Sequence, residues 1–127
     1  MDTIGDMLIR IKNAYAVGKE TVEVPYSKFK LNLAKILEKE GYIGEIMTQG
    51  RKARKVIRIK LKYRNKIPAV KGCKRISKPG RRIYVKKDEI PRPKYNGRVI
   101  ISTPYGLVTD IEARKRKLGG EVICQIW

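Results

Sequence analysis

The sequence predicts an α+β protein made of two small α/β-type domains that pack together. In the first half, helical and strand periodicities alternate in the order α-β-α-β-β; the second half is mostly short strands and turns, with one short helix. The length of 127 residues and the 42% hydrophobic content allow a buried core. We expect an N-terminal α/β domain at residues 1–64 and a C-terminal β-rich domain at residues 65–127.

The first two predicted elements are an amphipathic helix and a short strand. Apolar residues recur at helical spacing over residues 4–15, with Thr3 as the expected cap and Gly18 at the end of the pattern. Residues 21–24 alternate and contain β-branched side chains, which predicts a strand that Pro25 closes.

A second helix and two strands complete the predicted N-terminal domain. Ser27 is expected to cap a helix over residues 28 to 40, which Gly41 stops. A strand follows at residues 42–48, and the clearest alternation in the chain lies at residues 57–63. That alternation predicts a half-buried strand with a cationic outer face formed by Arg58, Lys60 and Lys62.

The C-terminal half is predicted from turn residues and short apolar runs. Thr109 and Glu112 have the spacing of a capping box, so a short basic helix is expected to run to about residue 117. The other expected elements, in chain order, are a strand at 70–76, a turn at 78–80, a strand or helical turn at 81–85, an extended link at 90–93, a buried strand at 99–102 and a final strand at 121–127.

The charge is strongly one-signed. The chain has 31 Lys and Arg against 12 Asp and Glu, a formal net charge of +19, and no acidic residue lies between Glu45 and Asp88. Ordinary soluble surfaces intersperse both signs, so a basic stretch of this length favours a polyanionic partner over a merely solvated surface. No apolar run approaches the roughly 20 residues that span a bilayer, so we expect no membrane partner.

The residue types argue against catalysis. The chain has no histidine, which removes the commonest general base and metal ligand, and it has no P-loop and no GxGxxG motif. Cys73 and Cys124 stand apart from any ligand set and are expected to be reduced, small core residues. We therefore expect no enzyme activity, no small-molecule substrate, no metal and no cofactor.

The loop from Ser102 to Gly106 is the sharpest candidate for a binding site. Ser102 and Thr103 offer hydroxyls, Tyr105 can stack on an unpaired base, and the glycine allows close backbone approach. Thr109 lies at the helix start, where free N–H groups suit a phosphate. An ordinary strand-to-helix turn explains the same residues equally well.

Two further clusters carry cations beside aromatic or polar groups. Arg81 and Arg82 precede Tyr84, an arrangement suited to phosphate contact and stacking, although a solvated arginine pair with a core tyrosine is equally consistent. Three polar residues on the first helix are better explained as solvated than as ligand-bound when spacing alone is considered: Arg10, Lys12 and Asn13.

Several segments together resemble the bacterial small-subunit ribosomal protein family numbered eight. The resemblance covers essentially the whole length. It includes the opening helix from Asp2 to Ala14 and the strand-to-helix junction from Val24 to Lys30. The remaining matching residues are Lys78 to Tyr84, Ile101 to Thr103, Gly106, Thr109, Asp110, Glu112 to Arg114, and Gly119 to Val122.

The resemblance implies a structural constituent of the small ribosomal subunit. Its expected partners are the central domain of small-subunit ribosomal RNA and neighbouring ribosomal proteins. A mimic of the same site in its own operon messenger RNA is a further candidate, through which translation would be repressed. The C-terminal domain is expected to carry most RNA contact. The positions that the resemblance implies for RNA contact are Ser102, Thr103 and Gly106, with Tyr84 and Glu121 nearby. The complete set of residues that we expect to bind rRNA adds Pro104, Tyr105, Thr109, Arg81, Arg82, Arg10, Lys12, Asn13, Lys28 and Lys30.

The loop departs from the family pattern at two positions. The family usually has Ser-Thr-Ser, a variable residue and Gly, whereas Pro104 and Tyr105 occupy the third and fourth positions here. Pro104 has neither a hydroxyl nor an N–H, so at least one expected hydrogen bond to RNA cannot form. Tyr105 compensates by stacking, or the contact is lost.

Other functions remain as rivals. An architectural DNA-binding protein is the main alternative, although the chain has no helix-turn-helix, zinc-finger or basic-region heptad pattern. An RNA-processing enzyme that uses lysine or carboxylate chemistry and a cationic membrane-surface protein are weaker alternatives.

Overall fold

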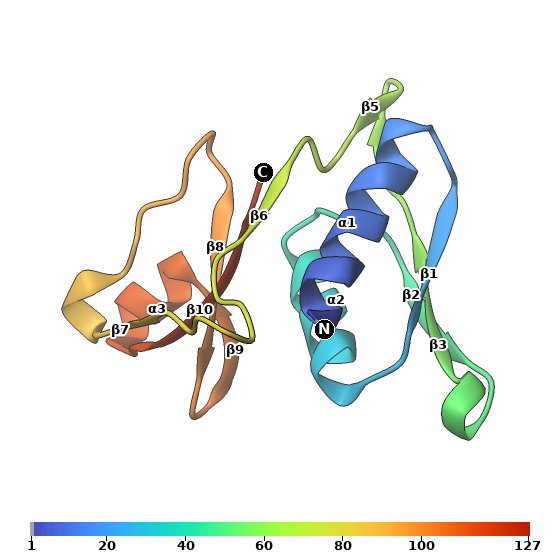
Figure 1. The fold of residues 1–127 in the computed structure, drawn as a ribbon. Helices are drawn as coiled ribbons and strands as arrows, with labels where there is room; N and C mark the ends of the chain where they lie inside the picture. Colours follow the sequence, from blue (N-terminus) through green and yellow to red (C-terminus); the bar gives the residue numbers. More distant parts are fainter. Residues whose placement is uncertain (1) are drawn as a thin grey trace. The chain divides into compact units, whose positions relative to one another are not determined.

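A computed structural model describes residues 2–127 and confirms the α+β class (Figure 1). The chain divides into two compact units. One unit is Asp6–Lys71, and the other is Gly72–Trp127 together with the few residues before Asp6.

The N-terminal unit is a three-stranded antiparallel sheet with two helices on one side of it (Figure 1). The helices are α1 (Thr3–Ala16) and α2 (Lys28–Lys39), and the strands pair in the order β1-β3-β2. Strand bounds are Thr21–Pro25 for β1, Ile46–Gln49 for β2 and Val56–Lys60 for β3.

Alternation along β3 works as predicted, because Ile57 and Ile59 are fully buried while Arg58 and Lys60 are exposed. Ser27 caps α2, since its hydroxyl accepts a hydrogen bond of 3.1 Å from the Lys30 backbone N–H. Both helices and the sheet bury apolar side chains in this unit, among them Met7, Leu33 and Ile57.

Three predictions for this unit were wrong in detail. The side chain of Asp2, not Thr3, accepts the hydrogen bond from an N–H of the first turn of α1, that of Gly5 at 3.0 Å. The expected strand at 42–48 forms only from Ile46, because the N–H of Tyr42 closes the end of α2 by donating to Leu37. The predicted strand at 57–63 ends at Lys60.

The chain beyond β3 forms a separate small hairpin. Strand β4 (Tyr63–Arg64) pairs with β5 (Ile67–Pro68), and the two residues between them adopt left-handed conformations, with φ of 52° at Asn65 and 65° at Lys66. Another unpredicted element is the short 3-10 helix Lys52–Arg54 in the loop between β2 and β3.

The second unit is a five-stranded antiparallel sheet with one helix. Four strands follow the order β6-β10-β8-β9, and β7 also pairs with β10. The bounds are Cys73–Arg75 for β6, Tyr84–Val85 for β7, Arg98–Thr103 for β8, Gly106–Thr109 for β9 and Gly120–Ile126 for β10. Helix α3 spans Asp110–Arg116, and a 3-10 helix spans Lys87–Glu89.

One face of this sheet forms the core of the second unit. Alternate residues of β8, β9 and β10 pack with Ala113 of α3. The cluster consists of Ile90, Val99, Ile101, Val108, Ala113 and Val122, with Ile76 and Val85 packed at its margin. Side chains that alternate with these lie on the opposite face.

The structure corrects four predictions for the second unit. The strand predicted at 70–76 is limited to Cys73–Arg75, and the strand or helical turn predicted at 81–85 is a strand limited to Tyr84–Val85. Strand β9 was not expected, so the segment 102–106 is a hairpin turn and not a strand-to-helix loop. Thr109 caps α3 through a 3.2 Å bond from the Glu112 N–H, but the Glu112 carboxylate lies 3.9 Å from Arg116 and does not complete a capping box.

Neither cysteine forms a disulfide, and their environments differ. Cys124 is fully buried, and burial raises the pKa of its thiol to about 12. Cys73 is only half-buried. The prediction of two small, reduced side chains therefore agrees with the structure, although only Cys124 is part of the core.

A thiol reagent should distinguish the two cysteines. At pH 8 a thiol with a pKa of about 12 is thiolate in only about one molecule in ten thousand, and the thiolate is the nucleophile. We expect iodoacetamide to alkylate Cys73 and to leave Cys124 unmodified until urea unfolds the chain, as measured by peptide mass spectrometry. Equal modification of both cysteines in native buffer would contradict the buried placement of Cys124.

Candidate nucleic-acid interface

Four side chains form a row across the second sheet, on the face opposite its core. In the pairing of β8 with its two neighbours, Ser102 lies opposite Leu107 of β9 and Glu121 of β10. In the pairing of β10 with β7, Glu121 lies opposite Tyr84. Directly opposed residues of antiparallel strands share a face, and the neighbouring Ile101 belongs to the core face. We call Leu107, Ser102, Glu121 and Tyr84 the Ser102 row.

The hairpin at the end of β8 presents an exposed turn beside this row. The hydroxyl of Thr103 donates a 2.8 Å hydrogen bond to the carbonyl of Gly106 and accepts one of 3.1 Å from the N–H of Tyr105. Thr103 is only 8% exposed, so it shapes the turn from within. Gly106 has φ of +112°, which a residue with a side chain rarely adopts, while Pro104 and Tyr105 project outward.

Ser102 has a different role from Thr103. Its side chain is half-buried and its hydroxyl makes no hydrogen bond with any group in residues 2–127, so both donor and acceptor remain available. Beneath it, a methyl group on Gly120 would overlap the Ser102 carbonyl oxygen. Gly120 therefore permits the close strand approach that places Ser102 beside Glu121, a requirement that spacing alone did not reveal.

The charged and aromatic side chains around the row are arranged by specific contacts. The Glu121 carboxylate, 16% exposed, pairs with the guanidinium of Arg82 at 3.1 Å. Tyr84 is 69% exposed, which excludes the alternative that it is a core residue. The Arg116 guanidinium lies 5.9 Å from the ring centroid of Tyr105, so a cation accompanies the exposed ring at the hairpin tip.

Two predicted residues of this unit lie away from the row. Thr109 is buried, with 7% exposure, and its hydroxyl is occupied by the cap of α3. Arg81 is exposed, but it lines a groove with Lys74 and Lys94 and does not share the ion pair of Arg82. The two adjacent arginines therefore lie in different environments: Arg81 lines the groove, and Arg82 pairs with Glu121 in the row.

The remaining predicted residues belong to the N-terminal unit. Arg10 is held by a 2.9 Å ion pair with Asp6, and together with Asn13 it lines a groove of about 570 Å³ beside β1. Lys12 and Lys28 are exposed. Lys30 is only 6% exposed, and burial lowers the pKa of its ammonium group while Asp6 opposes that shift. Lys30 is thus the least accessible of the predicted set.

The surface around these residues is cationic. In the acid-free stretch between Glu45 and Asp88, every lysine and arginine except Lys55 and Arg75 is exposed. No cluster of cysteine, aspartate and glutamate within residues 2–127 is arranged to hold a metal ion. Over the same residues, no helix has the length and apolar character needed to cross a bilayer.

Comparison with known proteins gives one consistent result. A family model described as "Ribosomal protein S8" matches residues 2–127. A protein of Dictyoglomus turgidum named "Small ribosomal subunit protein uS8" is 50% identical over 127 residues, which cover 99% of this chain and 97% of that protein. Proteins with the same name from Syntrophomonas wolfei and Clostridium novyi are 53% identical over 130 and 127 residues, with the same coverage.

Proposed function

Because the chain belongs to the ribosomal protein S8 family, we propose that it binds the central domain of small-subunit ribosomal RNA through the Ser102 row and the adjoining hairpin. Membership of this family makes the protein a structural component of the small ribosomal subunit, located in the cytoplasm, and not an enzyme. The observation that carries the proposal is the unpartnered Ser102 hydroxyl, in a row that ends at exposed Tyr84 on a cationic unit.

The row supplies groups that recognise folded RNA by shape and edge. A hydroxyl both donates and accepts, so Ser102 can bond a 2′-hydroxyl or a base edge in a shallow minor groove. Tyr84 offers a ring for stacking on a base that leaves the helix. Glu121 keeps Arg82 beside the row, where its guanidinium can meet a phosphate.

The hairpin supports the compensating role of Tyr105. Pro104 cannot donate or offer a hydroxyl, but the Tyr105 ring is 73% exposed with Arg116 alongside. We propose that Tyr105 stacks on RNA where relatives use a third polar residue. Thr103 contributes by holding the turn, because both of its hydroxyl contacts are internal.

We also propose roles in RNA binding for both domains and for the predicted residues of the N-terminal domain. The N-terminal domain, 1–64, and the C-terminal RNA-binding domain, 65–127, would share the RNA surface, with Arg10, Lys12, Asn13 and Lys28 as phosphate contacts of the first. Lys30 would act by packing, because it is buried. Neighbouring ribosomal proteins and the operon messenger RNA are the further partners.

An architectural DNA-binding protein is the alternative that a competition assay separates. Labelled ribosomal RNA fragment bound to the protein would be challenged with unlabelled RNA fragment or duplex DNA of equal length. We expect the RNA to displace the label at a far lower concentration. Preferential displacement by DNA would decide for the alternative.

Replacement of either hydroxyl residue, Ser102 or Thr103, should weaken specific RNA binding. We expect Ser102→Ala to weaken binding of the specific RNA helix about tenfold, the value of one well-placed hydrogen bond, with little change for a scrambled helix. Thr103→Ala should weaken specific binding as well, by loosening the turn. Electrophoretic mobility shift with both RNAs measures the difference, and equal loss on both would count against the interface.

A further inference from the structure

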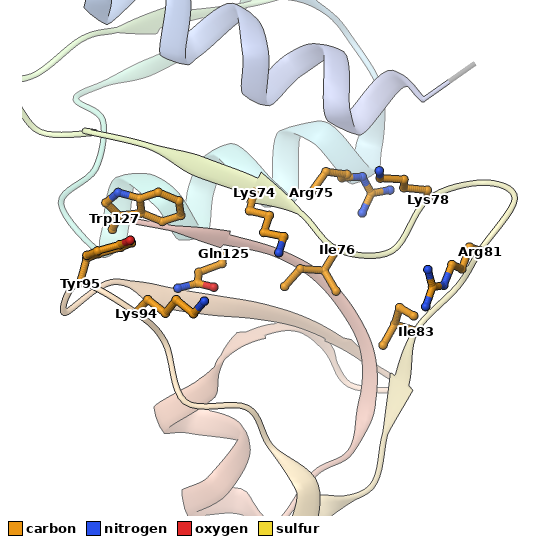
Figure 2. A pocket seen from close by; sticks show the side chains of 10 residues that line it. All are labelled: Lys74, Arg75, Ile76, Lys78, Arg81, Ile83, Lys94, Tyr95, Gln125 and Trp127. Atoms are coloured by element: carbon orange, nitrogen blue, oxygen red, sulfur yellow. The ribbon is translucent and has the colours of Figure 1, made fainter.

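A polar groove lies on the five-stranded sheet of the second unit, on the face opposite the Ser102 row. It has a volume of about 610 Å³ and is lined by residues of β6 and β10 and the segments near them (Figure 2). Gln125 pairs with Lys74 on one side and with the core residue Val99 on the other. Val99 and Ser102 stand three positions apart on β8, so the groove and the Ser102 row face opposite ways.

Gln125 carries a buried polar group with no partner. The residue is only 8% exposed, and within residues 2–127 its amide nitrogen has no hydrogen-bond acceptor. An unsatisfied buried donor is unfavourable and rare in native proteins. Figure 2 shows the Gln125 side chain among those that line the groove. The amide nitrogen is thus a buried donor without a partner, and a ligand that reaches it with an acceptor would satisfy it.

Two aromatic rings form one end of the groove. Their centroids, in Tyr95 and Trp127, lie 5.1 Å apart with planes inclined at 42°. Tyr95 is 73% exposed and adopts φ of +56°, an unfavourable conformation for a residue with a large side chain. Reciprocal backbone hydrogen bonds of 3.0 Å with Gly72 hold Trp127 in place. The groove thus presents an exposed Tyr95 ring that contacts the ring of Trp127.

Cations line the rest of the groove, and no acidic residue does. Arg75 is committed to an ion pair with Asp2 at 3.2 Å. The others are exposed and form no ion pair with the acidic groups of residues 2–127: Lys74, Lys78, Arg81 and Lys94. Unneutralised positive charge beside stacking rings matches a nucleotide better than an apolar or cationic ligand.

We propose that this groove binds one unpaired nucleotide of an RNA strand, separately from the Ser102 row. The base stacks on the exposed ring of Tyr95, the Gln125 amide donates to an acceptor on the base edge, and Lys74 and Lys94 hold the flanking phosphates. The volume falls within the range of about 300–1,000 Å³ typical of small-ligand sites. The inference adds a second RNA contact on the opposite face of the sheet.

Trp127 is the only tryptophan of the chain and therefore reports on this groove alone. The test titrates the full-length protein with hexauridylate and hexaadenylate in low-salt buffer and follows tryptophan fluorescence. We expect saturable quenching by at least one of the two oligonucleotides. Gln125→Leu should weaken that binding about tenfold, the effect of losing one good hydrogen bond, and Lys74→Gln with Lys94→Gln should weaken it further.

Control variants separate this site from the proposed function. Lys87→Gln removes an exposed charge of the same unit outside the groove, and Ser102→Ala alters the other face; both should leave the quenching unchanged. Gln125→Leu should also raise the urea midpoint, because it removes an unsatisfied amide, while binding of the ribosomal RNA helix persists. A lower midpoint, or loss of helix binding, would contradict the separation.

The outcomes that overturn the inference are specific. Absence of saturable quenching with both oligonucleotides, or equal affinity of wild type and Gln125→Leu, would refute a nucleotide site. Equal quenching by tripolyphosphate would show that only charge is recognised. Equal quenching by hexaglutamate would assign the groove to an acidic protein segment. Each of these results can occur while ribosomal RNA binding is intact, so each is distinguishable from failure of the proposed function.

Discussion

Raising the monovalent salt from about 50 mM to about 200 mM is expected to weaken binding to ribosomal RNA by about three to five orders of magnitude, if about 6–10 phosphates are contacted. Each lysine or arginine that neutralises a phosphate releases condensed counterions, and salt opposes that release. The net charge of +19 and the exposure of nearly all cations between Glu45 and Asp88 make such a contact number attainable. The scale is the one established for duplex DNA.

The slope of log affinity against log salt, from filter binding at several concentrations, is the measurement. Arg82→Gln should reduce its magnitude by about one, because one phosphate contact is lost. Ser102→Ala is the matched control, since it removes a neutral hydroxyl from the same row and should lower affinity without changing the slope. A flat salt response of the wild type would refute phosphate contact as the source of affinity.

The N-terminal unit could be predicted closely because its signals are local. Ser27 caps the helix that follows it, and the period-two alternation around Ile57 and Ile59 identifies both faces of one strand. The errors occurred where long-range pairing or capping decides an end. Strand β3 stops at Lys60 because its partners β1 and β2 pair no further along it.

The second unit was harder to predict because register decides it. Strand β9 has only four residues and begins with Gly106, so Val108 and Thr109 favour a strand but the segment is too short to reveal one without its pairing to β8. The same register assembles Ser102, Glu121 and Tyr84, which are far apart in the sequence. The family resemblance named these residues, whereas spacing alone did not bring them together.

The roles of neighbouring residues in the site could not be predicted, because they depend on tertiary contacts. Thr103 and Ser102 are adjacent hydroxyl residues with the same expected role, yet one closes a turn and the other is unpartnered. Arg81 and Arg82 likewise diverge, toward a groove and toward Glu121. Alternation along β8 explains why Ser102 and Thr103 differ, whereas Arg81 and Arg82 lie in the segment before β7, where no regular alternation holds.

Removal of the Asp110 carboxylate is expected to cause the largest loss of stability in the second unit. Asp110 is 1% exposed; its carboxylate accepts a 3.1 Å hydrogen bond from the buried N–H of Val99 and lies 3.4 Å from Arg114. Asp110→Ala should lower the free energy of unfolding by about 3 kcal/mol, because a charge-assisted hydrogen bond is lost and a buried N–H is left unsatisfied. Urea unfolding followed by Trp127 fluorescence measures this unit.

Two companion variants assign the loss to its cause. Asp110→Asn keeps an oxygen that can accept from the Val99 N–H, so it should lose about half as much, the part that depends on charge. Glu112→Ala breaks only the partly exposed pair with Arg116 and should change the free energy of unfolding by about 0.5 kcal/mol or less.

The hydrogen bond to Val99 ties the start of β8 to α3, and Ser102 lies on β8. The RNA affinity of Asp110→Ala should therefore fall in proportion to the folded fraction and recover when low temperature restores folding. A full affinity deficit in the folded variant would instead mean that Asp110 takes part in RNA recognition directly.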